Sequence, residues 1–184
     1  MIDSLLKHLK TIRTHKKWVR IACFKMGIPI QGILHDLSKF SLRELAIAKY
    51  YTGEKSPHDT CREILGYSPS WIYHFHRNKH HWEFWCETNV DGVWVPIKIP
   101  YKYVIEMFCD FIGAGKAYSG AFWTTSSPLD YWEAKCEGKR LMHPDSLALL
   151  KFLLVALANS KTEQDFYDYY NSNKQSIKSS YTHS

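Results

Sequence analysis

Apolar residues recur at helical spacing along most of this 184-residue chain, and this pattern constrains the fold more than any other feature. In the first helix, expected between Ser4 and Met26, they mark one buried face: Leu5, Leu9, Ile12, Val19, Ala22 and Met26. Gly27 and Pro29 then end this helix, because proline cannot continue a helix. The chain is therefore expected to fold mainly as helices that bury one side.

Helix-start signals divide much of the remaining chain. An apolar stretch over residues 30–40 precedes Ser41-x-x-Glu44, a capping box that predicts a helix to about Tyr51. Serines precede prolines at first helical positions in two further places: Ser56-Pro57 and Ser68-Pro69. We expect the later helices over 57–66, 69–80, 101–117, 128–137, 144–158 and 163–171.

One segment departs from the helical pattern. The run TNVDGVWVPIKI, residues 88–99, has an Asp-Gly turn between β-prone arms and predicts a hairpin. With no internal repeat and no linker, the length favours one domain. The predicted fold is therefore all-α: a single helical bundle over residues 1–171 with a small β-hairpin insertion near 88–99. The polar residues 172–184 are expected to form a disordered tail.

The composition excludes several classes of protein. Apolar residues make up 45% and charged residues 23%, which is unlike a disordered or collagen-like chain. The longest apolar run, Leu147 to Ala158, is shorter than the ~20 residues needed to cross a bilayer. The first ten residues contain Asp3 and lysines, and signal peptides have an uninterrupted apolar segment instead. Five scattered cysteines without a CxxC pair predict reduced thiols. We expect a cytoplasmic protein with no membrane partner.

Positive charge gathers near the start of the chain. The net charge is +6, and seven of the 24 basic residues lie between Lys7 and Lys25. Such a balance favours an anionic partner, such as nucleic acid, a nucleotide or a phosphoester, although a solvated helix face would explain it equally well.

The first candidate for chemistry is the pair His35-Asp36. Its close neighbours are apolar: Ile33, Leu34 and Leu37. They predict that the pair lies at the edge of the core, where a carboxylate is costly unless it is paired or binds a metal ion. Lys39 is three residues from Asp36 and would share its side of a helix. A polar, solvated helix face is the alternative.

Two further predicted helices carry polar groups on their apolar faces. His8 and His15 share the stripe that contains Ile12, and neutral imidazole is a good ligand for divalent transition metals. Asp110 lies in VIEMFCDFIGAG, with Glu106 one turn before it. Two carboxylates on an otherwise apolar helix need cations nearby, and a metal ion would meet that need.

The densest cluster is WIYHFHRNKHHWEFW, residues 71–85, with four histidines in eight residues. If the segment is helical to residue 81, then His74 and His81 lie on one face with Asn78 between them, whereas His76 and His80 share another face. Metal ligation is the favoured interpretation. The interleaved tryptophans could instead stack on bases, as in single-strand binders, or simply pack in a core.

The order of these candidates resembles the HD-domain superfamily of metal-dependent phosphohydrolases, whose pattern is a His, a His-Asp pair and a distal Asp on separate helices. The segment HDLSK resembles the HDxxK form of two-metal members. The phrases HLKTIRTHK, GILHDLSKFS, NKHHWEFW and YVIEMFCD also resemble, over about residues 8–145, a small uncharacterised branch of HD-like proteins from bacterial and phage genomes.

The resemblance implies a ligand set and a cofactor. Four residues match the core metal set: His15, His35, Asp36 and Asp110. Three residues match the positions of second-metal ligands: His74, His80 and His81. Which of His80 and His81 binds the ion is left open. The implied cofactor is one or two divalent ions (Mn, Fe, Co, Zn or Ni, with Mg also possible). His76 fits neither set, and the Gly-Tyr-Pro segment of cyclic-dinucleotide phosphodiesterases is absent from the sequence.

The remaining roles follow from the same resemblance and from the residues beside the cluster. Asp36 and Lys39 would act in catalysis, with Lys39 facing the substrate phosphate. Lys79 could also act in catalysis. Together with Lys39, three residues could contact an anionic substrate: Arg77, Asn78 and Lys79. Glu106 would orient a ligand histidine, and Asn78 could act in the same way.

The expected function is hydrolysis of a phosphoester or phosphoanhydride bond by a metal-activated water, in a small nucleotide-like substrate. One alternative is a diiron HD-type oxygenase that acts on a small molecule, because histidine-rich ligation also suits iron. A second alternative is a non-catalytic nucleic-acid-binding or inhibitory protein that uses the basic first helix.

Overall fold

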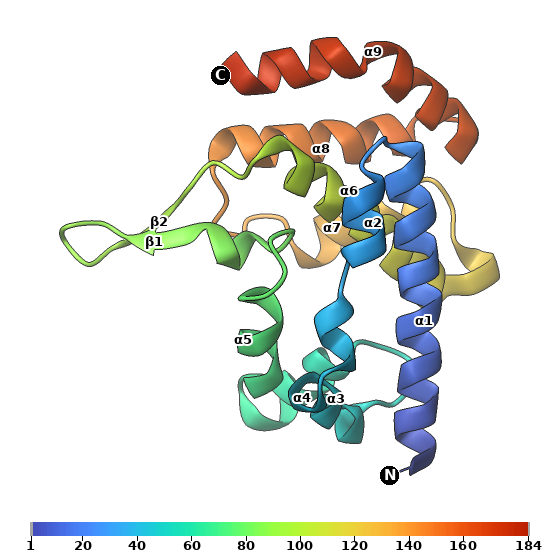
Figure 1. Ribbon diagram of the computed structural model, residues 1–184, viewed down its shortest axis with the longest axis vertical. Coiled ribbons are helices and arrows are strands. Elements are labelled where there is room, and N and C mark those ends of the chain that lie inside the picture. The colour runs from blue at the N-terminus through green and yellow to red at the C-terminus, as the bar shows by residue number, and fades with distance from the viewer. Residues whose placement is uncertain (1, 184) are drawn as a thin grey trace.

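The structure, a computed structural model, describes residues 2–183. Within this range the fold is all-α with one small antiparallel hairpin, as the sequence predicts (Figure 1). The α-helices are α1 (Ile2–Lys25), α2 (Pro29–Leu34), α3 (Leu42–Leu45), α4 (Pro57–Leu65), α5 (Pro69–Phe75), α6 (Tyr101–Ser119), α7 (Ser127–Lys135), α8 (Pro144–Ala158) and α9 (Glu163–His183).

Short 3₁₀ helices and the hairpin connect these elements. The 3₁₀ helices are η1 (Leu37–Phe40), η2 (Ala46–Tyr50), η3 (Trp82–Trp85) and η4 (Gly120–Phe122). Strands β1 (Cys86–Thr88) and β2 (Trp94–Pro96) pair with Glu87 opposite Val95, and the hairpin projects from the side of the molecule (Figure 1).

The core lies where α1 and α6 pack against each other and α8 and α9 cover one end (Figure 1). Gly113 on α6 makes the close approach of α1 possible. A Cβ atom there would lie 2.3 Å from Val19 Cγ2 and 3.2 Å from the backbone oxygen of His15. Because His15 and Asp110 flank this contact, the missing side chain brings them within reach of each other.

The short helices α3, α4 and α5 form the opposite end of the molecule from α8 and α9 (Figure 1). Proline begins both α4 and α5, and the Ser56 hydroxyl accepts a hydrogen bond at the start of α4 as expected. A cavity lined by many polar side chains lies between these short helices and the α1–α6 pair.

The prediction of a disordered tail at 172–184 is wrong for the part that the structure describes. Helix α9 continues to His183, and Tyr181 is buried with its hydroxyl 2.8 Å from Ser146 Oγ. The signal was present in the sequence, because apolar or aromatic residues recur at helical spacing along α9: Phe166, Tyr170, Ile177 and Tyr181. The low overall apolar content of the segment hid this stripe.

Three local predictions also need correction. The helix expected over 69–80 ends at Phe75, and the helix expected to Tyr51 becomes α3 followed by η2. The apolar neighbours of the His35-Asp36 pair are more than half exposed, although the pair itself is buried. The reason is that Asp36 has a left-handed backbone (φ 53°), which turns the chain between α2 and η1 and reverses which side chains face inward.

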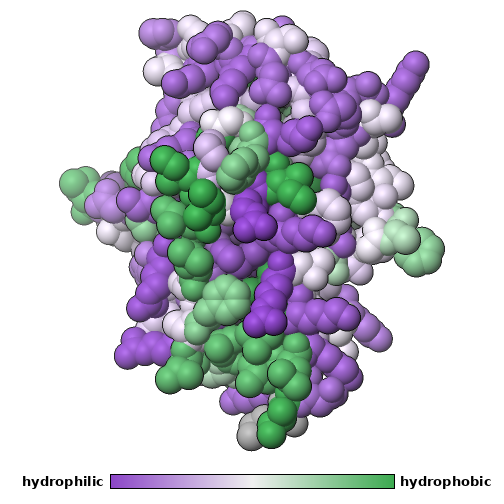
Figure 2. All heavy atoms as spheres, turned by 45° about the vertical axis from the view of Figure 1, so that its right-hand side comes forward, coloured by the Kyte–Doolittle hydropathy of each residue, from purple (hydrophilic) through white to green (hydrophobic). Residues whose placement is uncertain are grey.

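The surface carries many exposed apolar side chains, and Figure 2 shows several patches of them among hydrophilic side chains on one face. Within residues 2–183, none of the helices combines the length and the apolar character that crossing a membrane would require.

Candidate metal centre

Asp36 lies at the centre of a cluster of buried polar side chains. Its backbone conformation is one that a non-glycine residue adopts at a cost of about 1–3 kcal/mol, a kind of strain that often marks functional positions. This conformation turns the carboxylate inward, where it is completely buried and each oxygen faces a different set of histidines.

Oδ2 of Asp36 faces the first set, which we name donor group one: His15, His35, Asp36 and Asp110. Helix α1 supplies His15, the turn after α2 supplies the His35-Asp36 pair, and α6 supplies Asp110. His15 Nε2 lies 3.0 Å from Asp110 Oδ1, 3.3 Å from His35 Nε2 and 3.4 Å from Asp36 Oδ2.

Oδ1 of Asp36 faces the second set, donor group two: Asp36, His74, His80 and His81. His74 Nε2 lies 3.5 Å from this oxygen and His80 Nε2 lies 3.6 Å from it. His81 Nε2 lies 2.8 Å from His74 Nε2. The Asp36 carboxylate is therefore shared by both groups, with one oxygen in each.

The spacing of these atoms is that of ligands around an ion. Metal–nitrogen and metal–oxygen bonds of ~2.0–2.1 Å place neighbouring donors ~3.0–3.4 Å apart in octahedral or tetrahedral geometry. In donor group one, His35 Nε2 is 3.3 Å from both Asp36 Oδ2 and Asp110 Oδ1, and the His15 separations lie in the same range. Each group could hold one cation.

Glutamates behind the rings fix which nitrogen faces the centre. The Nδ1 of His35 donates to Glu106 Oε1 (2.9 Å), and the Nδ1 of His80 is 3.2 Å from the same oxygen. The Nδ1 of His74 donates to Glu44 Oε2 (2.7 Å). A proton held at Nδ1 leaves the Nε2 lone pair free, which is the tautomer that binds a metal ion.

Two of these ligand atoms have no hydrogen-bond partner in the described part of the protein. Oδ1 of Asp36 and Nε2 of His80 are fully buried without one and lie 3.6 Å apart. Unpaired buried polar atoms are costly, and here their lone pairs also face one another. A cation between them would satisfy both of them together, so the residues fit a metal ion.

The electrostatics of the two groups differ. Burial would raise the pKa of Asp36 and Asp110, but the neighbouring histidines outweigh it and hold both well below their usual value. Burial lowers the pKa of His74 and His81, so these rings are neutral and ready to bind. The pKa of His35 is raised, because nearby carboxylates outweigh its burial.

Lys39 is the cationic residue closest to the centre. Its Nζ lies 2.5 Å from Asp36 Oδ2. Burial would lower the pKa of Lys39, but Asp36 and Asp110 hold it above its usual value, so the side chain is charged. The lysine reaches this position from η1, in the turn made by the left-handed backbone of Asp36.

A cavity of about 450 Å³ opens beside the cluster. Its lining includes Lys39, donors from both groups, and aromatic side chains of α5, η3, α6 and α7. This volume is in the range of small-molecule sites, ~300–1,000 Å³.

The structure brings together all seven residues matched to metal positions: His15, His35, Asp36, His74, His80, His81 and Asp110. Both members of the pair left open, His80 and His81, reach donor group two. They reach it from the turn after α5, because α5 ends at Phe75. The prediction that His74 and His81 share one face of a continuous helix is therefore wrong. Glu106 contacts two ring nitrogens, in keeping with the orienting role expected for it.

Three residues predicted to contact substrate lie elsewhere. Lys79 is exposed over the rings of Phe84 and Tyr103, and Arg77 lies over Tyr73, so neither lines the cavity. Asn78 is buried and donates to Ser38 Oγ and to the backbone oxygen of His74, each at 2.8 Å. It positions the His74 turn. The sequence prediction failed because the helix stops and redirects these side chains.

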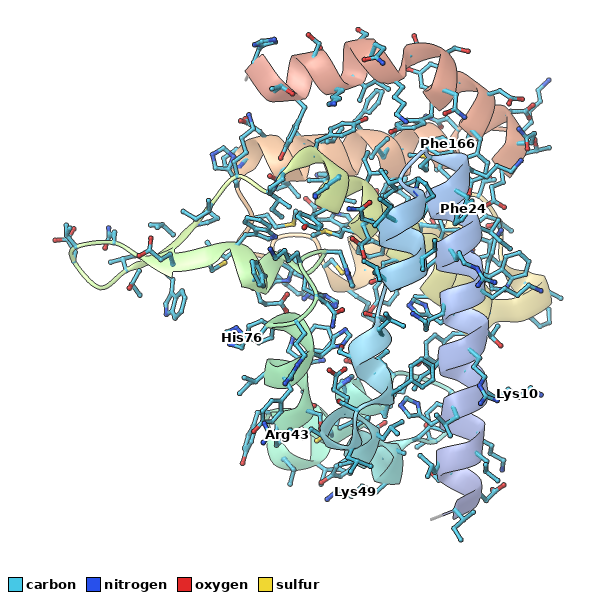
Figure 3. The ribbon with its side chains drawn as sticks, in the orientation of Figure 1. Lys10, Phe24, Arg43, Lys49, His76 and Phe166 are labelled. Carbon is cyan, nitrogen blue, oxygen red and sulfur yellow. The ribbon has the colours of Figure 1, made fainter. Side chains whose placement is uncertain are left out.

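His76 also lies outside the cluster. It is exposed at the end of α5 and Figure 3 shows it on the outer side of that helix. Its exclusion from the ligand set is consistent with this position.

Sequence reasoning missed two residues that the structure places at the site. The sequence predicts that Glu44 is part of a capping box, but its carboxylate accepts a hydrogen bond from His74, and Ser41 caps only its backbone. His58 lines the cavity, and no local pattern identifies it. His8, which the sequence places on the same stripe as His15, lines the cavity but belongs to neither donor group.

Most basic residues of α1 are exposed on the side away from the buried face that carries His15, as Figure 3 shows for Lys10. Lys16 is the exception among the described residues of α1, since its Nζ donates to the backbone oxygen of His35. The nucleic-acid alternative therefore stays a prediction about another face of the molecule.

Comparison with known proteins adds a family and no function. No curated protein and no solved structure matches the chain. Residues 4–156 match the model of a family described as a family of unknown function (DUF5662), a range that contains both donor groups. Since the matched range covers most of the chain, the protein belongs to this family of unknown function (DUF5662).

Proposed function

We propose that the protein is a metal-dependent phosphohydrolase of the HD type, which cleaves a phosphoester or phosphoanhydride bond of a small nucleotide-like substrate. The observation that carries this proposal is the Asp36 carboxylate, which directs one oxygen to each donor group. Two divalent ions, when bound, supply Lewis acidity and lower the pKa of a coordinated water to about 7.

The residues of the chain would bind the ions, orient the imidazole rings and neutralise the substrate phosphate. Five imidazoles and two carboxylates hold the ions: His15, His35, His74, His80, His81, Asp36 and Asp110. Glu44 and Glu106 hold the rings in the metal-binding tautomer. Lys39 faces the cavity beside Asp36, where its charge would neutralise a phosphate oxygen.

Elemental analysis followed by a phosphate-release screen tests this proposal. The protein is purified, its metals are counted, and nucleotides are offered with Mn²⁺, Mg²⁺, Co²⁺ or Fe²⁺. We expect two ions per chain and phosphate release that stops on chelation. Asp36→Asn should lower both the metal content and the rate, by about 1,000-fold or more, because the shared ligand is lost.

The matched control is Asp91→Asn, which changes an exposed carboxylate in the hairpin turn. It should leave metal content and rate unchanged. A protein that binds no ion, or that works at full rate after its ions are removed, would contradict the proposal.

Oxygenase chemistry remains a second candidate because five of the seven donors are imidazoles, a set compatible with iron. The two candidates differ in their need for oxygen. Two irons per chain, no phosphate release from any ester, and substrate turnover only with O₂ would favour the oxygenase.

A further inference from the structure

The cavity beside the donor groups has few cationic side chains in its lining, and those it has lie beside carboxylates. We propose that it takes a phosphomonoester whose alcohol carries a planar ring, the class of a nucleoside 5′-monophosphate, in preference to a di- or triphosphate. This inference rests on the proposed function, since the single phosphate would lie against the two donor groups and Lys39.

Size limits the ligand to one small molecule. The cavity has a volume of about 450 Å³, which accommodates a compact ligand, and residues of α1, α4, α5, α6 and α7 line it. A nucleotide polymer would need an open groove with a series of cations along it.

Cations that could bind further phosphates are already paired. Among the described residues that line the cavity, three carry a lysine or arginine side chain: Lys39, Lys55 and Arg140. Lys55 Nζ is 2.6 Å from Glu63 Oε1 and 2.5 Å from Oε2, and Arg140 lies over the ring of Trp82 with Glu83 Oε1 3.9 Å away. Lys39 alone faces the metal centre, beside Asp36.

Carboxylates outside the two donor groups also line the cavity. Glu54 is exposed, whereas Asp59 Oδ1 is 3.0 Å from Arg62 Nη1. His8, which also lines the cavity, adds no charge, because burial lowers its pKa to about 4. A second or third phosphate near Glu54 would meet a carboxylate where it needs a cation.

The cavity also offers aromatic surface. Trp71, Phe111 and Tyr131 line it, and Tyr131 is half exposed. Aromatic faces stack on planar rings such as nucleobases. A ring attached to the phosphate by a short alcohol would use this surface, whereas an aliphatic sugar phosphate would leave it uncovered.

Equilibrium binding tests the proposal directly. Adenosine mono-, di- and triphosphate and ribose 5-phosphate are titrated into the Mn²⁺-loaded protein by calorimetry, with free Mn²⁺ in excess over the nucleotide. We expect the monophosphate to bind at least tenfold tighter than the triphosphate and at least tenfold tighter than ribose 5-phosphate.

Two exposed positions on the cavity wall separate the charge from the ring contribution. Glu54→Gln should reduce the preference for mono- over triphosphate several-fold, with exposed Glu133→Gln on α7 as its control. Tyr131→Leu should reduce the preference for the monophosphate over ribose 5-phosphate several-fold, with Tyr169→Leu on α9 as its control.

The outcomes distinguish this inference from the proposed function. Triphosphate binding as tight as monophosphate binding, or no monophosphate binding at all, would overturn the inference. Phosphate release is measured on the same samples. Release from the triphosphate in preference would support hydrolysis and overturn the substrate class, whereas selective monophosphate binding without release would support the class and count against hydrolysis.

Discussion

The two donor groups that meet at Asp36 are built in different ways. Donor group one depends on two long helices, α1 and α6, whose packing brings His15 to Asp110. Donor group two depends on a short helix and the turn after it, which places His74, His80 and His81. Rigid helices position the first group, whereas hydrogen bonds to Glu44 and Asn78 must hold the second.

This difference shows how one carboxylate can join two sites that are positioned by different kinds of element. Asp36 belongs to both groups, and Glu106 contacts one ring from each. The comparison predicts that substitutions act on one group, the other, or both, according to which contacts they remove.

The largest difference should come from removing one ligand of each group. His15→Ala and His81→Ala should each lower the metal content from two ions to one, and each should reduce phosphate release by about 100-fold or more. Elemental analysis gives the count, and the electron paramagnetic resonance of bound Mn²⁺ should change from a coupled pair to an isolated ion.

His76→Ala is the control for both variants, because His76 is an exposed histidine of the same segment as His81. If either ligand variant retained two ions, the division into two groups would be wrong.

The next largest effect should come from the glutamates behind the rings. Glu106→Gln should weaken both ions by roughly 10–100-fold, because it contacts His35 and His80. Glu44→Gln should weaken only the ion of donor group two, because it contacts His74. Competition with a chelating indicator resolves the two affinities. If the two variants weakened both ions equally, Glu44 would not act on donor group two alone, which would contradict the account.

A smaller effect is expected where the helices touch. Gly113→Ala places a Cβ against Val19, which should push α1 from α6 and lower the free energy of unfolding by about 1–3 kcal/mol. The ion of donor group one should weaken a few-fold and that of group two should not change. Val19→Ala in the same protein should restore part of the loss, as measured by denaturant unfolding and metal titration.

The smallest effect on the two ions is expected at His8, which shares the buried face of α1 with His15 but belongs to neither group. Its folded pKa of about 4 lies below the unfolded value of about 6.5, so the unfolded chain binds an extra proton between these values. The stability of the metal-free protein should therefore fall as the pH drops from 7.5 to 5, by about 2 kcal/mol from this residue.

His8→Gln should lack this contribution. The difference in unfolding free energy between wild type and variant, measured in denaturant at pH 7.5 and pH 5, would show it. A difference that does not change with pH would mean that His8 titrates normally in the folded protein.

The sequence predicted the helices where the apolar stripe is long, as in α1, α6 and α8. The stripes also showed that His15 and Asp110 are polar groups on buried faces, but which residues would meet was predicted only through the resemblance to the HD-domain pattern. The hairpin followed from its Asp-Gly turn.

The remainder could not be predicted because it depends on contacts between distant segments. No local pattern indicates that Asp36 adopts a left-handed backbone, or that Glu44 crosses to His74 thirty residues away. The chain direction after Phe75 is set by the same long-range contacts, and this is why Lys79 and Arg77 were expected at the cavity and lie outside it.

Anomalous diffraction from crystals grown with Mn²⁺ tests the central claim most directly. The account predicts two peaks ~3.5–4 Å apart, one on each side of the Asp36 carboxylate, with His15 and Asp110 at one and His74 and His81 at the other. Absence of any peak at Asp36, or ions bound only at other positions, would contradict it.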